Sequence, residues 1–100
     1  MNEDEFLKGI KQSIEDLLVL YKLEYNYIKP QVDYVLNNNI KNIIYIEDLL
    51  EKLLNIPYEP CYVLFVNLCN YVSTFNYEIA QDYIALYNEI YGENEIENKR

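Results

Sequence analysis

The stretch from Pro60 to Phe75, PCYVLFVNLCNYVSTF, most constrains the fold because it carries no charged residue. Its apolar side chains would point to nearly every side of a helix. They are Cys61, Leu64, Phe65, Leu68 and Val72 on one stripe, with Val63, Val66, Cys69 and Tyr71 over the remainder. A helix that is apolar all round is normally covered on several sides. We therefore expect residues 60–74 to form a buried central helix.

The size and composition of the chain favour one helical domain. At 100 residues it is long enough to bury a hydrophobic core without disulfides or metals. Apolar residues make up 51%, which argues against disorder, and only two Gly and three Pro argue against an all-β fold. We predict an all-α, compact bundle of four to five helices over residues 1–92, followed by a flexible charged tail at 93–100.

The first predicted helix is long and amphipathic. Asn2 and Glu5 resemble a capping box at its start. Pro30 is expected to end it, because the residue before a proline avoids the α region, and to begin a second helix. The apolar face of the first helix consists of Leu7, Ile10, Ile14, Leu17, Tyr21 and Ile28.

Asparagines and prolines predict the remaining boundaries. The run 37–39 is all asparagine, whose side chains compete with the backbone for hydrogen bonds, so a break is expected before a helix that begins near Asn42. The alternative is one continuous helix, because the apolar heptad register continues from Val32 to Leu53. Later boundaries are expected at Pro60, at Asn76 as a helix cap, and at Gly92 as a helix end.

The charge of the chain is negative and unevenly distributed. Acidic residues outnumber basic ones by 17 to 8, and no Lys or Arg lies between Lys52 and Lys99. This charge repels phosphate backbones and anionic lipid and attracts basic surfaces. We therefore expect a basic protein partner and no direct nucleic-acid or membrane binding. The alternative is that the charge serves solubility alone.

The chain shows no membrane-spanning or secretory pattern. Its longest apolar run, Cys61 to Val66, has six residues, whereas a span needs about 20. Cys61 and Cys69 would lie about 12 Å apart along one helix, too far for a disulfide. Buried free thiols suit a reducing compartment, so a cytoplasmic location is expected.

The residues that enzymes most often use are missing. There is no histidine, and two glycines cannot build a phosphate-binding loop. The pairs Glu47/Glu51 and Glu78/Asp82 each share a helix face, but carboxylate metal bundles usually also use histidine. We expect solvated carboxylates, no cofactor or metal, and no enzymatic activity.

Tyrosines and carboxylates along the last predicted helix form the candidate partner-binding site. Its core-facing seam is predicted to be Ile79, Tyr83, Leu86 and Ile90, with further tyrosines at the flank. Tyrosine is enriched at protein interfaces, although these tyrosines could instead line the core margin, and an AT-rich genome would explain their number. The candidate residues are Glu78, Asp82, Tyr83, Tyr87, Glu89 and Tyr91.

These features favour a small acidic, non-enzymatic binding protein that occludes a basic protein partner. In size, charge and expected architecture it resembles small acidic helical proteins that neutralise toxins or nucleases, such as bacterial immunity proteins and phage-encoded inhibitors of host defence. No residue motif carries this resemblance, so it assigns no site residue. The alternative is a self-associating structural or regulatory module, a homodimer formed through apolar seams or tyrosine flanks.

Overall fold

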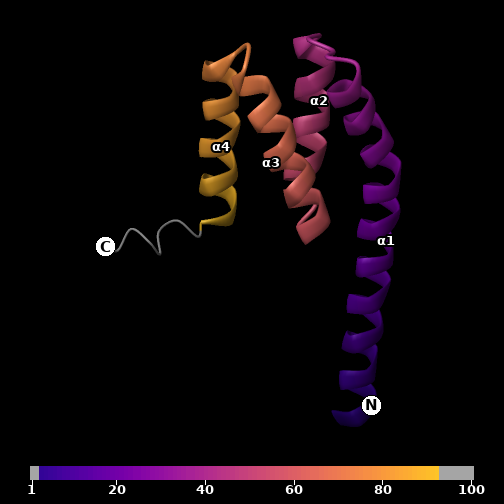
Figure 1. Cartoon of the computed structure of the whole chain (residues 1–100). Helices are drawn as coiled ribbons and strands as arrows, with labels where there is room; N and C mark the ends of the chain where they lie inside the picture. Colours follow the sequence, from indigo (N-terminus) through magenta and orange to yellow (C-terminus); the bar gives the residue numbers. More distant parts are fainter. Residues whose placement is uncertain (1–2, 93–100) are drawn as a thin grey trace.

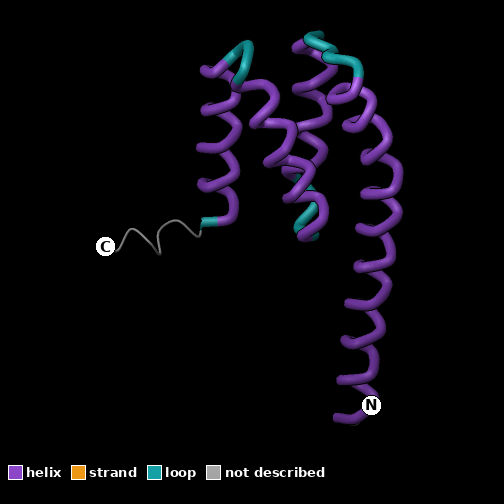
Figure 2. Tube along the Cα trace, in the orientation of Figure 1, coloured by secondary structure: helices purple, strands orange, loops and turns teal. Residues whose placement is uncertain are grey.

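A computed structural model describes residues 3–92, and all of its regular secondary structure is helical (Figures 1 and 2). The helices are α1 (Glu3–Asn37), α2 (Ile43–Leu54), α3 (Glu59–Ser73) and α4 (Tyr77–Tyr91). The predicted all-α class is therefore confirmed for this part of the chain. The predicted cap at Asn2 and the predicted tail at 93–100 lie outside the described residues.

The four helices form a flat bundle from which α1 projects. α2 and α3 lie between α1 and α4, and α1 extends far beyond their ends (Figure 1). The largest dimension, 57 Å, is close to the length of α1 itself, which is about 52 Å at 1.5 Å per residue. The core lies where α1, α2 and α3 meet, and its fully enclosed residues include Val32, Val35, Ile46, Leu49, Leu50, Leu68 and Val72.

The helix α3 contacts every other helix but is not enclosed by them. Tyr62 and Val63 on its outer side remain 44% and 48% exposed. The smallest dimension of the molecule is 16 Å, and packed helix axes lie roughly 8–10 Å apart, so the bundle is only about two layers thick. The expectation of a buried central helix over residues 60–74 is therefore not confirmed, because α3 buries one face and leaves its outer side open. Asn67 and Asn70 also lie exposed.

The helix α1 continues through Pro30, so the predicted end there is wrong. A proline inside a helix removes one backbone hydrogen bond and costs about 3 kcal/mol. Pro30 itself is exposed, so water can reach the backbone carbonyl that loses its partner. On the opposite side, Ile28, Val32 and Val35 are buried on both sides of the proline. This burial stabilises one continuous helix in place of the two predicted ones.

The predicted break at the three asparagines is confirmed, and the continuous-helix alternative is wrong. Asn39 adopts a left-handed conformation with φ of 53°, which asparagine tolerates better than most residues. The Ile40 N–H then donates to the Val35 carbonyl at 3.1 Å and closes the end of α1. Asn42 caps α2, because its side-chain oxygen accepts a hydrogen bond from the Tyr45 N–H at 3.1 Å.

The later boundaries also agree with the local capping rules. Pro60 is the second residue of α3, where its missing N–H costs nothing. The side chain of Asn76 accepts a hydrogen bond from the Ile79 N–H at 3.2 Å and so caps α4. Gly92, with φ of 61°, ends α4 in the left-handed conformation expected of a glycine at this position.

Candidate interaction surfaces

Three of the four tyrosines of α4, Tyr83, Tyr87 and Tyr91, face the bundle and join α4 to its neighbours. The Tyr91 hydroxyl donates to the Leu54 carbonyl at the end of α2, at 2.6 Å. The Tyr83 hydroxyl lies 3.2 Å from Glu51 Oε2 and 3.4 Å from Glu47 Oε1, both on α2. These phenols therefore hold α4 against α2 as well as against α3.

The ring of Tyr87 occupies the middle of an aromatic cluster between α3 and α4. Its centroid lies 5.0 Å from that of Tyr62, 5.2 Å from Phe65 and 4.5 Å from Tyr91. Aromatic rings at such distances attract each other in addition to the area that they bury. The cluster makes α3 and α4 one packed unit.

The predicted core-facing seam of α4 is therefore partly wrong. Ile79 and Tyr83 do pack against the core, but Leu86 and Ile90 remain 39% and 52% exposed. Ala80 is fully buried, on the same face of the helix as Tyr83, Tyr87 and Tyr91. Relative to the predicted seam, the helix is rotated so that Tyr87 and Tyr91, not Leu86 and Ile90, face inward.

Burial changes the acidity of two of these phenols. Desolvation, assisted by the carboxylates of Glu47 and Glu51, raises the pKa of Tyr83 well above its usual range. Desolvation also raises the pKa of Tyr91. Both hydroxyls therefore remain protonated and able to donate hydrogen bonds over the whole neutral range.

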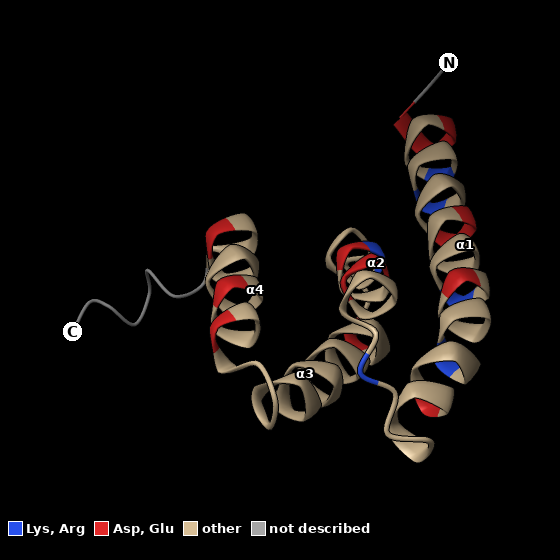
Figure 3. Ribbon diagram, turned by 90° about the horizontal axis from the view of Figure 1, so that it is seen from above, with Lys and Arg blue, Asp and Glu red and all other residues tan. Residues whose placement is uncertain are grey.

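The three candidate carboxylates lie on the other side of α4. Glu78, Asp82 and Glu89 are all exposed. At 3.6 residues per turn they share a face roughly opposite the tyrosines, and Figure 3 shows the acidic residues of α4 on its outer side, away from α2 and α3. The six predicted residues thus form two separate sets, one facing the bundle and one facing solvent. Their role in partner binding stays a prediction.

Between residues 3 and 92 no cluster of potential metal ligands is found, and both cysteines are buried. The pair Glu47/Glu51 lies beside Tyr83, and nowhere in this range do three potential metal ligands gather. Cys61 and Cys69 are buried free thiols. Burial raises the pKa of both, to about 11 for Cys69, so the less reactive thiol form predominates.

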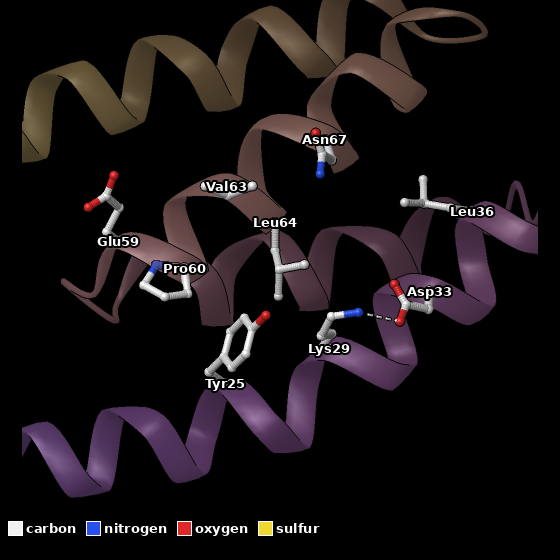
Figure 4. A pocket seen from close by; sticks show the side chains of 9 residues that line it. All are labelled: Tyr25, Lys29, Asp33, Leu36, Glu59, Pro60, Val63, Leu64 and Asn67. Carbon is white, nitrogen blue, oxygen red and sulfur yellow. Dashed lines mark hydrogen bonds and ion pairs between the residues drawn. The ribbon is translucent and has the colours of Figure 1, made fainter.

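A groove of about 480 Å³ lies between α1 and α3 (Figure 4). Its walls are largely apolar, with Leu64 and Val63 contributed by α3. The polar groups that line it include the ion pair between Lys29 Nζ and Asp33 Oδ2, at 2.8 Å. Asp33 raises the pKa of Lys29 through this hydrogen bond. No polar side chain is buried anywhere in residues 3–92, so no buried polar group is directed into the groove.

The first half of α1 is exposed and rich in large apolar side chains. Every residue from 3 to 20, here called the α1 arm, is exposed. Eight of its side chains are large and apolar, and each is between 42% and 57% exposed. They are Phe6, Leu7, Ile10, Ile14, Leu17, Leu18, Val19 and Leu20. No other described helix reaches this part of α1 (Figure 1).

The apolar face of the α1 arm continues the buried face of the second half of α1. In heptad terms, Leu7, Ile14 and Tyr21 occupy position a, and so do the buried Ile28 and Val35. The sequence pattern identified this face but implied that the bundle would cover it. The lengths of the predicted helices could have shown that part of this face stays exposed, because the later apolar segments are far shorter than the first one.

Neither the sequence nor the fold indicates a family. The chain matches no protein-family model, no curated protein and no solved structure. In the part of the chain that the structure describes, no helix is both long enough and apolar enough to cross a membrane. Any functional conclusion therefore depends on the surfaces described above.

Proposed function

We propose that this protein is a small non-enzymatic module that binds another protein chain through the α1 arm. The observation that carries the proposal is the exposed heptad face of Leu7, Ile10, Ile14 and Leu17. Monomeric soluble proteins rarely expose a contiguous apolar patch larger than roughly a few hundred Å². An apolar stripe along the whole exposed part of a helix is typical of a surface that packs against another helix.

The energetics of an isolated helix support the same proposal. Most of the stability of a protein helix comes from packing of its apolar face, and helices that lack such packing are marginal in water. The α1 arm has no packing partner among residues 3–92. A second helix laid along the arm would remove its half-exposed side chains from water, at about 25 cal/mol per Å².

Two matched variants test the role of this face. Ile14 lies on the heptad face and Val19 on the opposite side of the helix, and they are 55% and 57% exposed. We expect Ile14→Glu to abolish capture of the partner, including untagged copies of the same chain, from the cells that make the protein. Val19→Glu adds the same charge and should leave capture unchanged. Equal capture by the original protein and both variants would refute the proposal.

A second candidate function is the occlusion of a basic protein, as an inhibitor of a toxin or a nuclease would do. It is supported by the outward carboxylates Glu78, Asp82 and Glu89 and by the lack of any Lys or Arg in residues 53–92. Such a surface speeds encounter with a basic partner. Two buried free thiols suit action in the reducing cytoplasm.

Charge reversal on α4 separates this candidate from the first one. If the acidic face binds the partner, changing all three carboxylates to lysine should abolish capture at low salt, and added salt should weaken capture by the original protein. Capture that depends on Ile14 but not on these carboxylates would exclude the inhibitor interpretation.

A further inference from the structure

We propose that the α1 arm pairs with the α1 arm of a second copy, antiparallel, to form a symmetric dimer. This inference rests on the proposed function, because it names the occupant of the same exposed face. The register of the heptad residues, the exposed length of the helix and the charges along its edges all favour this pairing.

The heptad residues select one antiparallel register. In a two-stranded coiled coil the a and d residues form the seam, and when the helices run in opposite directions an a residue meets a d residue. Leu7 would then lie against Leu17 of the second copy, and Ile10 against Ile14. In both pairs the residue numbers sum to 24. The seam would bury four large aliphatic side chains from each copy, all of which are exposed in one chain alone.

The length of the exposed part of α1 agrees with this register to within one residue. The bundle begins at Tyr21 and Tyr25, whose rings lie 6.5 Å and 6.1 Å from that of Tyr58. Two arms that overlap completely over residues 3–20 give a sum of 23, within one residue of the heptad register. The second helix would therefore end where the bundle begins, and the two bundles would lie at opposite ends of the pair. This arrangement leaves the folded part of each copy unchanged.

The edges of the arm are complementary in this arrangement. Along one edge, Asp4 would approach Lys22 of the second copy. The two Lys11 and two Glu15 side chains would lie together about the two-fold axis, with no net charge. In the described structure none of these four residues forms an ion pair within its own chain. Along the other edge, Phe6 would approach Leu20, both of which are more than half exposed. A parallel pair would instead place the acidic first turns, Glu3 to Glu5, beside each other.

Sedimentation of three proteins at about 100 μM tests the pairing, because an interface near the small end of the usual range should have a micromolar dissociation constant. We expect the original chain and Val19→Glu to be dimers. Ile14→Glu should be a folded monomer, with dimerisation weakened at least about 100-fold, because it places a charge in the apolar seam of both copies. Circular dichroism checks that each protein is folded.

Cysteine cross-linking tests the direction of the helices. The single variants Phe6→Cys and Leu20→Cys are mixed and oxidised, while the buried Cys61 and Cys69 serve as an internal background. The antiparallel register predicts a disulfide between the two different variants. A disulfide between two copies of Phe6→Cys would show a parallel pair and overturn the proposal.

The outcomes separate this inference from the proposed function. A monomeric original chain at this concentration, or a dimer that Ile14→Glu leaves intact, overturns pairing through the arm. If capture of another protein from cells still depends on Ile14, the binding function stands and only the identity of the partner is wrong. If neither dimerisation nor capture depends on Ile14, both the inference and the proposed function fail.

Discussion

The two halves of α1 share one apolar pattern, but the first half is exposed to solvent and the second half is buried. At heptad position a, Leu7 and Ile14 are 54% and 55% exposed, whereas Ile28 and Val35 are 3% and 0% exposed. The cause lies elsewhere in the chain. α2 and α3 have 12 and 15 residues, about 18 Å and 23 Å, and cannot cover a helix of 35 residues. A periodic pattern thus identifies a face that favours burial without identifying what covers it.

The largest expected effect is on the free energy of unfolding, when the same substitution of isoleucine by alanine is made in each half of α1. Ile28→Ala should lower the free energy of unfolding by about 2–5 kcal/mol, because it leaves a cavity in the core. Ile14→Ala should change it by less than about 0.5 kcal/mol, because Ile14 touches no core residue in a single chain. Urea denaturation followed by circular dichroism measures both, at concentrations too low for dimers.

An equal loss in the two variants would contradict the distinction between the halves. It would mean that the α1 arm folds back onto the bundle in solution. Val19→Ala is a suitable control, because Val19 is exposed on the opposite side of the arm and alanine favours helix.

Much of the secondary structure could be predicted from sequence because its boundaries are local. Asn42, Asn76 and Gly92 begin or end helices through hydrogen bonds and backbone conformations within a few residues. The effect of Pro30 could not be predicted in this way. Its local cost of about 3 kcal/mol is opposed by the burial of Val32 and Val35, which depends on helices that follow later in the chain.

Surfaces were harder to predict than helices. The spacing of Tyr83, Tyr87 and Tyr91 shows that they share a face, but not whether the face points inward. The structure places them against α2 and α3 and leaves Glu78 and Asp82 outside. Similarly, the lack of charge in 60–75 indicated an interior helix, but the bundle has too few layers to cover its outer side.

The second largest effect on the free energy of unfolding is expected in the loop that follows the buried half of α1. The Tyr71 hydroxyl donates to the Ile40 carbonyl at 2.6 Å and links α3 to this loop. Tyr71→Phe should lower the free energy of unfolding by about 1–2 kcal/mol, because the part-buried carbonyl loses its donor. Tyr34→Phe, on the exposed side of α1, should have no measurable effect in the same urea experiment.

A loss of stability in both tyrosine variants would show that the second half of α1 is packed on more sides than the structure indicates. No loss in Tyr71→Phe would show that water replaces the phenol and that the loop needs no link to α3.

A smaller loss of stability is expected at alkaline pH, and it should affect the bundle and not the α1 arm. Burial beside Glu47 and Glu51 raises the pKa of Tyr83 in the folded state above the value of 10.0 expected when unfolded. The stability that Tyr83 contributes is therefore fully present below about pH 10 and is lost as the pH rises towards the folded-state pKa. Urea denaturation between about pH 8 and about pH 11 should show a shallower decline for Tyr83→Phe than for the original chain.

The α1 arm supplies the contrast, because it contains no tyrosine. Its helical content should not follow the titration of Tyr83. An identical pH dependence in Tyr83→Phe and the original chain would show that other groups control alkaline unfolding and that the phenol is hydrated.

The smallest effect tests whether the α1 arm unfolds independently of the bundle. Gly9 lies inside the arm helix, and an added Cβ would meet nothing within 4 Å. Gly9→Ala should therefore stabilise the arm by about 0.5–1 kcal/mol through helix propensity alone. Hydrogen exchange at dilution should slow up to about fivefold for amides near residue 9, because the arm opens locally. The urea midpoint of the bundle should not move.

Lys8→Ala is the matched control, since lysine and alanine differ little in helix propensity and Lys8 is equally exposed. The decisive comparison is between local and global stability. If Gly9→Ala raised the urea midpoint by the full propensity gain, the arm and the bundle would unfold as one cooperative unit. The arm would then be part of the core structure of a single chain, and its exposed face would no longer indicate a second helix. An effect confined to local exchange shows instead that the arm gains nothing from its own bundle, which leaves its apolar face available for another chain.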